Sequence, residues 1–172
     1  LLKTGGFPTG ITSRFPIKEI SRTLEGYHHG MLSCKTGGVR VYVAHLHPGH
    51  WKIRHGEVDL LTRELAKWDP SEKILLAGDF NTFSPKDREQ YEKTPDIVPF
   101  FRRLDKRWKS NRNLRDDQLD YTHLEKIEKA GYLDLVAGKR TRFLGTFPTK
   151  NRPGEDNGPS RRLDYFFANR SL

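Results

Sequence analysis

Residues 75–82 read Leu-Leu-Ala-Gly-Asp-Phe-Asn-Thr, and this stretch carries most of the information about fold and site. The apolar run that begins at Ile74 predicts a short buried strand. Gly78 lets the backbone turn, so Asp79 and Asn81 are expected at the carboxyl end of that strand. Because residues two apart in an extended segment point to one side, a carboxylate and a carboxamide should emerge together. Such a pair suits a water, a metal ion or a phosphate oxygen, although Asp and Asn are also ordinary turn formers.

The composition limits the class of protein. The chain has 172 residues with 34% hydrophobic content, which is enough for one domain with a core. No apolar stretch is long enough to span a bilayer, so we expect no transmembrane segment. A single cysteine, Cys34, excludes an internal disulfide and a zinc site built from cysteines. The net charge of +9 favours a polyanionic partner: nucleic acid, a phosphorylated substrate or an anionic membrane surface.

The positive charge is concentrated between residues 101 and 117. This segment holds seven Lys and Arg residues against three Asp residues, with Trp108 among them. A basic stretch with an aromatic side chain is able to follow a phosphate backbone and stack a base. A solvated helix face with a loop is the commoner meaning of such a run. We interpret residues 84–117 as a basic insertion in the domain.

Strand and helix patterns alternate along the chain. The sequence Lys-Thr-Gly-Gly at 35–38 predicts a hairpin turn between two extended segments. Val58, Leu61, Leu65 and Trp68 follow the spacing of an amphipathic helix. The further expected strands lie at 10–17, 132–136, 142–149 and 162–168, and the further expected helices at 97–108 and 118–130. Strands paired by hairpins and interleaved with helices predict a mixed α/β (α+β) fold in a single domain over residues 1–172.

Five motifs occur in an order that resembles the endonuclease/exonuclease/phosphatase superfamily. They are the strand at 10–17, Val-Ala-His-Leu at 43–46, Gly-Asp-Phe-Asn at 78–81, Ala-Gly-Tyr-Leu-Asp at 130–134 and Arg-Leu-Asp-Tyr at 162–165. The resemblance implies a four-layer α/β-β/α sandwich of two packed mixed sheets, incomplete in this chain. It also implies divalent-metal-dependent hydrolysis of phosphoester bonds by an activated water.

The resemblance assigns a role to each polar residue at a strand end. Asp79 would orient and deprotonate the attacking water, and Asp79 and Asn81 would bind Mg²⁺ or Mn²⁺. Asn81 would also donate to the scissile phosphate, and His45 would contact a phosphate oxygen. Asp164 would hold a partner histidine in the correct tautomer. Independently of the family, Asp164 lies among apolar neighbours, where a buried carboxylate needs a partner.

The histidines near His45 leave an alternative open. His45 and His47 share one strand face and are also a candidate metal pair. His45 is preferred as the phosphate contact because it matches the family motif, whereas His47 begins a loop. His28 and His29 are expected on the surface of the hairpin.

Three arginines also remain open. Arg54 would reach a phosphate or, more commonly, form an ion pair on a helix surface. Arg161 and Arg162 would steer a substrate or lie on a solvated strand edge, and neither is assigned to the site. Asp134 is expected to be a structural carboxylate in a turn.

Two parts of the family pattern are absent from these 172 residues. They are an opening strand with its asparagine and a "QE" glutamate that binds metal, and a closing "SDH" with an essential histidine. Asp79 and Asn81 alone would bind magnesium poorly, so we expect the chain to be a piece of a larger enzyme. The alternative is a catalytically incomplete domain of the same fold that acts as a basic module for nucleic acid or anionic lipid. The positive charge favours nucleic acid among the phosphoester substrates.

Overall fold

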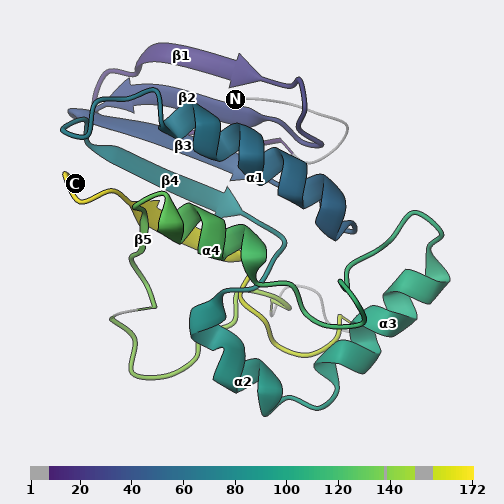
Figure 1. Ribbon diagram of the computed structural model, residues 1–172. Coiled ribbons are helices and arrows are strands. Elements are labelled where there is room, and N and C mark those ends of the chain that lie inside the picture. Colours follow the sequence, from purple (N-terminus) through teal and green to yellow (C-terminus); the bar gives the residue numbers. More distant parts are fainter. Residues whose placement is uncertain (1–7, 138, 150–156) are drawn as a thin grey trace.

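A six-stranded mixed sheet organises residues 8–137, 139–149 and 157–172, the parts of the chain that the computed structural model describes (Figure 1). The strands, in the spatial order β1-β2-β3-β4-β6-β5, are β1 (Lys18–Thr23), β2 (Met31–Thr36), β3 (Val39–His45), β4 (Ile74–Asp79), β5 (Leu133–Asp134) and β6 (Asp164–Ala168). The helices are α1 (Trp51–Leu65), α2 (Arg88–Glu92), α3 (Ile97–Arg107) and α4 (Thr122–Lys129), with a 3-10 turn η1 (Pro85–Asp87).

The sheet is mixed because helix α1 connects two parallel strands. Strands β3 and β4 run parallel, with α1 as the crossover between them. The other neighbouring pairs are antiparallel. Gly37 and Gly38 have φ values of 56° and 79° and form the predicted hairpin turn between β2 and β3. The mixed α/β class predicted from the sequence is confirmed.

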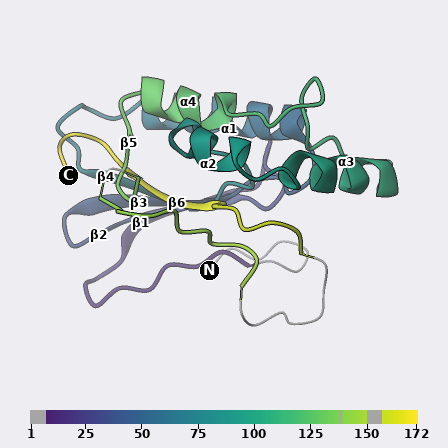
Figure 2. The same cartoon turned by 90° about the horizontal axis from the view of Figure 1, so that it is seen from below.

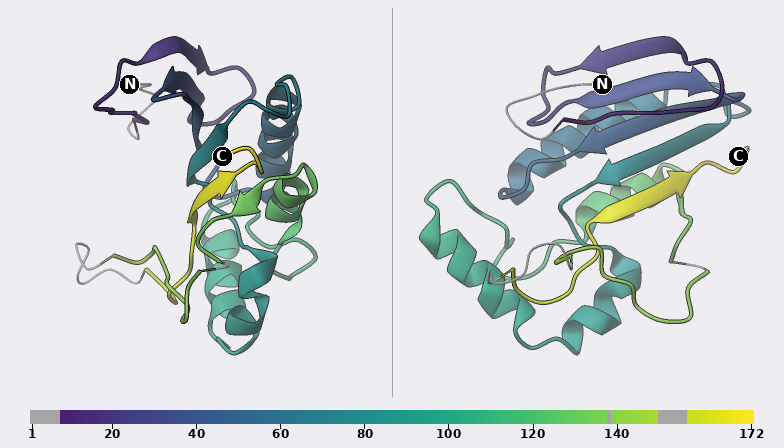
Figure 3. Two further views of the ribbon diagram at one scale, coloured as in Figure 1. Left: turned by 90° about the vertical axis from the view of Figure 1, so that its left-hand side faces the viewer. Right: turned by 180° about the vertical axis from the view of Figure 1, so that it is seen from behind.

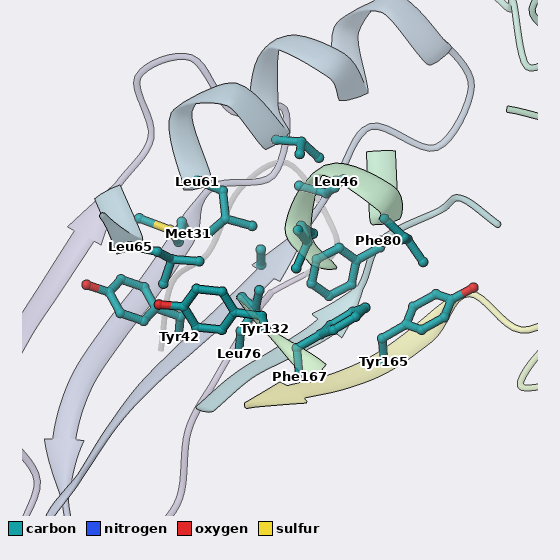
Figure 4. Close-up of a cluster of buried hydrophobic side chains, with 14 of the residues drawn as sticks. Met31, Tyr42, Leu46, Leu61, Leu65, Leu76, Phe80, Tyr132, Tyr165 and Phe167 are labelled. Atoms are coloured by element: carbon teal, nitrogen blue, oxygen red, sulfur yellow. The ribbon is translucent and has the colours of Figure 1, made fainter. Parts of the chain in front are cut away.

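Helices α1 and α4 cover one face of the sheet (Figure 2). The main core lies between these two helices and the sheet. The strands contribute Tyr42, Leu76 and Phe167 to it, and α1 contributes Leu61 (Figure 4). These side chains alternate along their strands with residues that point to the other face, as the pleat of a strand requires. The residues that alternate with these core residues along β3, β4 and β6 therefore point away from the helices.

The second face of the sheet is largely uncovered by helix. Val43, Ala77 and Phe166 lie side by side there, and Phe166 is 51% exposed. Irregular segments at 8–17 and 141–149 run along this side (Figure 2). The two packed sheets implied by the resemblance are thus not both present in the described residues, which form one sheet with helices on one face.

The basic insertion packs against the domain through its own apolar cluster beyond the end of the sheet. The buried members of this cluster are Phe83, Tyr91, Ile97, Phe100, Phe101 and Leu114. Helix α3 holds three of them on its inner side, and it extends away from the sheet (Figure 3). The helix predicted at 97–108 is confirmed within one residue.

Several predicted elements are displaced. The strand expected at 10–17 is wrong: pairing begins at Lys18, after Pro16, which has no N–H to donate to a ladder. Residues 142–149 are irregular apart from an isolated bridge between Phe147 and Arg161. Helix α4 begins at Thr122 rather than 118. Just before it, the Asp120 carboxylate accepts from the Thr122 N–H at 2.9 Å, as in an Asx-turn.

None of the helices in the described parts of the chain is both long and apolar enough to cross a membrane.

Candidate functional site

Three neighbouring strands bring His45, Asp79 and Asp164 into one row. His45 is paired in register with Asp79, and Asp79 with Asp164. All three follow the alternation that directs side chains away from helices α1 and α4. The Nε2 atom of His45 lies 3.8 Å from Oδ2 of Asp79, which is beyond hydrogen-bond range but close enough for a shared ligand. The convergence expected from the sequence is present for these three residues.

Gly78 sets the position of Asp79. Its φ is +137°, and a Cβ atom there would lie 1.9 Å from the carbonyl oxygen of Ala44. Only glycine therefore allows β4 to approach β3 at this point. Strand β4 ends at Asp79, which therefore lies at the carboxyl end of the strand as expected.

Asn81 braces the turn that follows Asp79. Its backbone has a φ of +48°, and its N–H donates to Oδ1 of Asp79 at 2.8 Å. The side-chain amide donates to the carbonyl oxygen of Leu46 at 2.9 Å. The backbone N–H of Leu46 in turn donates to the Asp79 carbonyl oxygen at 2.9 Å. Asn81 thus lies beside Asp79 as expected, with an amide hydrogen already bonded to the loop after His45.

Burial and a second carboxylate make Asp79 unusually basic. Burial raises the pKa of Asp79 to about 7, the charge of Asp164 adds to this effect, and the Asn81 N–H opposes it. Asp79 is therefore able to accept a proton near neutral pH. Asp164 itself is exposed, because β6 turns it to the uncovered face. The expectation that Asp164 is buried and needs a partner is wrong.

We expect Asp79→Asn to stabilise the metal-free protein at pH 8. The pKa in the folded state, about 7, exceeds the ordinary value of 3.8, so folding favours the protonated form. The stability associated with that proton is complete below pH 4 and is lost as the pH rises through 7. Asparagine resembles the neutral carboxyl. The gain should be about 1–2 kcal/mol, less than the full shift implies because the side chain is one-third exposed.

Urea unfolding in EDTA at pH 4 and pH 8 measures this gain. The two proteins should have similar free energies of unfolding at pH 4 and should diverge as the pH rises. An equal difference at both pH values would show that Asp79 titrates normally.

Four histidines form a contiguous cluster beside the row. The ring centroids of His29 and His45 lie 4.1 Å apart, those of His28 and His29 4.3 Å, and those of His28 and His47 4.3 Å. His29 is 8% exposed, so the expectation of a surface residue is wrong for it, whereas His28 is exposed. The position of His29 in the sequence, one residue before Gly30 in a hairpin, gave no sign that its ring stacks on His45.

Three histidines of this cluster, His29, His45 and His47, have pKa values below the ordinary value of 6.5. Burial, with the neighbouring imidazoles, lowers the pKa of His29 and of His47 to about 4. Burial also lowers the pKa of His45, with Asp164 opposing. A neutral imidazole at position 45 carries one N–H donor.

The metal pair of His45 and His47 is not supported. His47 turns towards His28, and its Nδ1 accepts from the Gly49 N–H at 3.0 Å. Across the described residues, no group of three or more His, Cys, Asp or Glu side chains is arranged to hold a metal ion.

Glu57 and Arg54 on helix α1 anchor the loops that carry these histidines. The fully buried Glu57 carboxylate accepts from the backbone N–H groups of His28 at 2.7 Å and His47 at 2.8 Å. Arg54 is 1% exposed and donates to the His47 carbonyl oxygen at 3.0 Å. The ion pair expected for Arg54 on the helix surface is wrong, because the side chain is buried. Through its bond to His47, Arg54 fixes the loop that follows His45.

A pocket of about 350 Å³ opens beside Asp79 and Asn81. Its other walls come from the loop after β3, from helix α3 with the following turn, and from the approach to β6. They include Pro48, Gly49, Phe101, Leu104, Trp108, Asn111, Asn113, Phe147, Arg161 and Leu163. The basic insertion therefore contributes a wall of the pocket next to Asp79.

Arg161 and Arg162 have opposite environments. Arg162 is buried and donates to the carboxylates of Asp87 at 2.8 Å and Asp134 at 2.7 Å. Asp134 also accepts from two backbone N–H groups of its turn, as expected for a structural carboxylate. Arg161 lines the pocket beside Asp79. Arg161 was not assigned to the site from the sequence, where its place three residues before Asp164 was the one indication of a role there.

Comparisons with known proteins identify the fold. No protein-family model and no curated protein matches the sequence. Among solved structures, an AP endonuclease from Archaeoglobus fulgidus matches with a TM-score of 0.60 at 17% identity, over 91% of this chain and 60% of that chain. The 3′ phosphatase NExo from Neisseria, bound to a product DNA hairpin, matches with a TM-score of 0.57 at 13% identity, over 93% and 61%.

A third similar structure is an endonuclease/exonuclease/phosphatase family protein from Bacteroides thetaiotaomicron. It matches with a TM-score of 0.51 at 16% identity, over 91% of this chain and 52% of that chain. At such identities the likeness shows a common fold. The chain spans about three-fifths of the length of the first two proteins.

Proposed function

We propose that this chain, which has the fold of the endonuclease/exonuclease/phosphatase superfamily, belongs to a divalent-metal-dependent hydrolase of phosphoester bonds. One observation carries the proposal. Asp79, whose pKa is about 7, lies between His45 and Asp164 on three adjacent strands and at the edge of a pocket. Perturbed carboxylates of this kind in a concave site are typical of general bases.

The residues of the row divide the chemistry between them. Asp79 takes a proton from the water that attacks phosphorus. His45, neutral at pH 7, donates a hydrogen bond to a phosphoryl oxygen as negative charge grows there. Asp164 acts on Asp79 through its charge and keeps it basic. Asn81 holds the Asp79 carboxylate in place through its backbone N–H.

The donors at the site suit a hard cation. Asp79 and Asn81 offer oxygen atoms, and the repulsion between Asp79 and Asp164 would be relieved by a dication. Mg²⁺ or Mn²⁺ would be held by Asp79 and Asn81, because Mg²⁺ commonly uses one or two carboxylates and fills its shell with water and phosphate oxygens. When bound, the ion would neutralise charge on the phosphoryl group.

Nucleic acid is the substrate class that the charge favours. The chain carries a net charge of +9, and helix α3 with its basic residues borders the pocket. Trp108, which follows α3 and is 53% exposed, offers a stacking surface at the rim. Two proteins of the same fold are named as an AP endonuclease and as a 3′ phosphatase bound to DNA.

Hydrolysis of bis(p-nitrophenyl) phosphate by the protein that contains this chain tests the proposal. Turnover should require Mg²⁺ or Mn²⁺ and should stop in EDTA. His45→Ala should lower kcat/KM by about 10²-fold, the effect of removing one donor to a developing oxyanion. His55→Ala, at a half-exposed histidine of α1 that lies 3.9 Å from Asp59, is the matched control and should retain full activity. Equal losses for both variants would argue against His45 as a substrate contact.

A non-catalytic binding module is the second candidate. It is favoured by the absence, among the described residues, of a complete side-chain group able to hold a metal. Such a module would bind DNA with an affinity that falls steeply as salt is added, and without turnover. Metal-dependent turnover that His45→Ala impairs excludes it.

A further inference from the structure

Arg161 is a buried cation within an aromatic cage. It is 6% exposed, and its guanidinium carbon lies 5.0 Å, 5.3 Å and 4.7 Å from the ring centroids of Phe100, Phe101 and Phe147. Its Nη1 donates to the carbonyl oxygens of Asn157 at 2.7 Å and Pro159 at 2.9 Å. These contacts fix the side chain in one position.

In the described parts of the chain, no carboxylate forms an ion pair with Arg161. Among the described residues, no Asp or Glu lies within 4.0 Å of its guanidinium, and its Nε has no hydrogen-bond partner. Arg162, the next residue, forms ion pairs with Asp87 and Asp134. A desolvated cation with unused hydrogen-bonding capacity is costly unless an anion binds it.

Arg161 faces the same pocket as Asp79 and Asn81. The Asp79 charge acts on Arg161 across this space without an ion pair between them. Burial lowers the pKa of Arg161 to about 10, so it remains charged at neutral pH. Arg161 and the proposed base thus line the same pocket of about 350 Å³.

We infer that Arg161 binds the phosphoryl group that is attacked at Asp79, donating to its non-bridging oxygens. The inference rests on the proposed phosphoesterase function and adds a substrate-binding residue to it. A planar guanidinium presents paired N–H donors that match the oxygens of a phosphate. The aromatic rings of Phe100, Phe101 and Phe147 hold the cation in place without neutralising its charge, so it is able to attract an anion.

Titration with inorganic phosphate by calorimetry tests the inference without turnover. Arg161→Gln should weaken phosphate binding by about tenfold or more, since a charged hydrogen-bond donor is lost. Arg63→Gln removes the same charge from the exposed side of helix α1 and should bind phosphate like the wild type. Equal affinity of the Arg161→Gln variant and the wild type overturns the inference.

The NMR signal of the Arg161 guanidinium Nε–Hε in the wild-type protein gives a second measurement, in case Arg161→Gln does not fold. The signal should shift on addition of phosphate, and an unchanged signal overturns the inference. Hydrolysis assayed in parallel separates the two proposals. Turnover that depends on Asp79 but not on Arg161 removes only the inference. Phosphate binding at Arg161 without any turnover removes only the proposed hydrolase.

Discussion

Asp79→Ala is expected to lower kcat/KM for bis(p-nitrophenyl) phosphate by about 10³–10⁴-fold. The substitution removes the carboxylate that accepts the proton from water and that would hold the metal ion, and each of these roles is large. The neighbouring Asp164 cannot take over the role, since it lies on the next strand and acts on Asp79 through space. Initial rates with saturating Mn²⁺ at pH 8 measure the loss.

The wild-type rate in Mn²⁺ should also rise with pH, with a midpoint below 7, because a dication bound at Asp79 favours the ionised carboxylate. Asp79 must be ionised to act as a base, and only in the metal-free protein do burial and the Asp164 charge raise the pKa of its carboxyl to about 7. Asp96→Ala, at an exposed carboxylate before helix α3, is the matched control and should leave the rate unchanged. An Asp79→Ala variant as fast as this control would remove Asp79 from the chemistry.

Arg162→Met is expected to lower the free energy of unfolding by about 3–5 kcal/mol. The guanidinium joins Asp87 from turn η1 to Asp134 from β5, and all three side chains are buried. Removing the cation leaves the buried Asp134 carboxylate without its cationic partner and leaves Asp87 with only the ion pair to Arg140. Since Arg162 immediately precedes Leu163 and Asp164, the same substitution should also make the position of Asp164 less well fixed.

Equilibrium unfolding in urea gives the size of this loss. Arg88→Met is the matched control, because Arg88 is half exposed and lies 3.7 Å from Glu125 in a surface ion pair. Its cost should stay below about 1 kcal/mol. Similar costs for the two variants would mean that the buried network contributes no more than an exposed pair.

The strand that carries Asp79 was predictable because its information is local. The apolar run 74–77 and Gly78 are short-range signals, and the order of His45, Asp79 and Asp164 along the chain matched a known pattern. The sheet then places three residues that are far apart in sequence in one row. Local signals thus identified the members of the site, and topology explains why they meet.

The environments of Arg161 and Arg162 were not predictable, because they depend on distant partners. The two residues are adjacent and chemically identical. One is neutralised by Asp87 and Asp134, which lie far away in the sequence, and the other is enclosed by aromatic rings from helix α3. No short-range pattern distinguishes these two outcomes.

The exposure of Asp164 and the burial of His29 were mispredicted for a related reason. Asp164 has apolar neighbours in sequence, yet alternation along β6 turns those neighbours to the two faces and leaves the carboxylate on the uncovered one. His29 is buried because it stacks on His45 of the neighbouring strand β3. Both results depend on which face of the sheet is covered. The hydrophobic pattern of the sequence does not specify that face here.

The pKa of the Asp79 carboxyl decides whether this residue is the base of the site. Its ¹³C chemical shift, followed against pH in metal-free buffer, should show a midpoint near 7, and Asp164→Asn should lower that midpoint. A midpoint close to 4 in the wild-type protein, unchanged by Asp164→Asn, would contradict the claim that burial and Asp164 make Asp79 the base of this site.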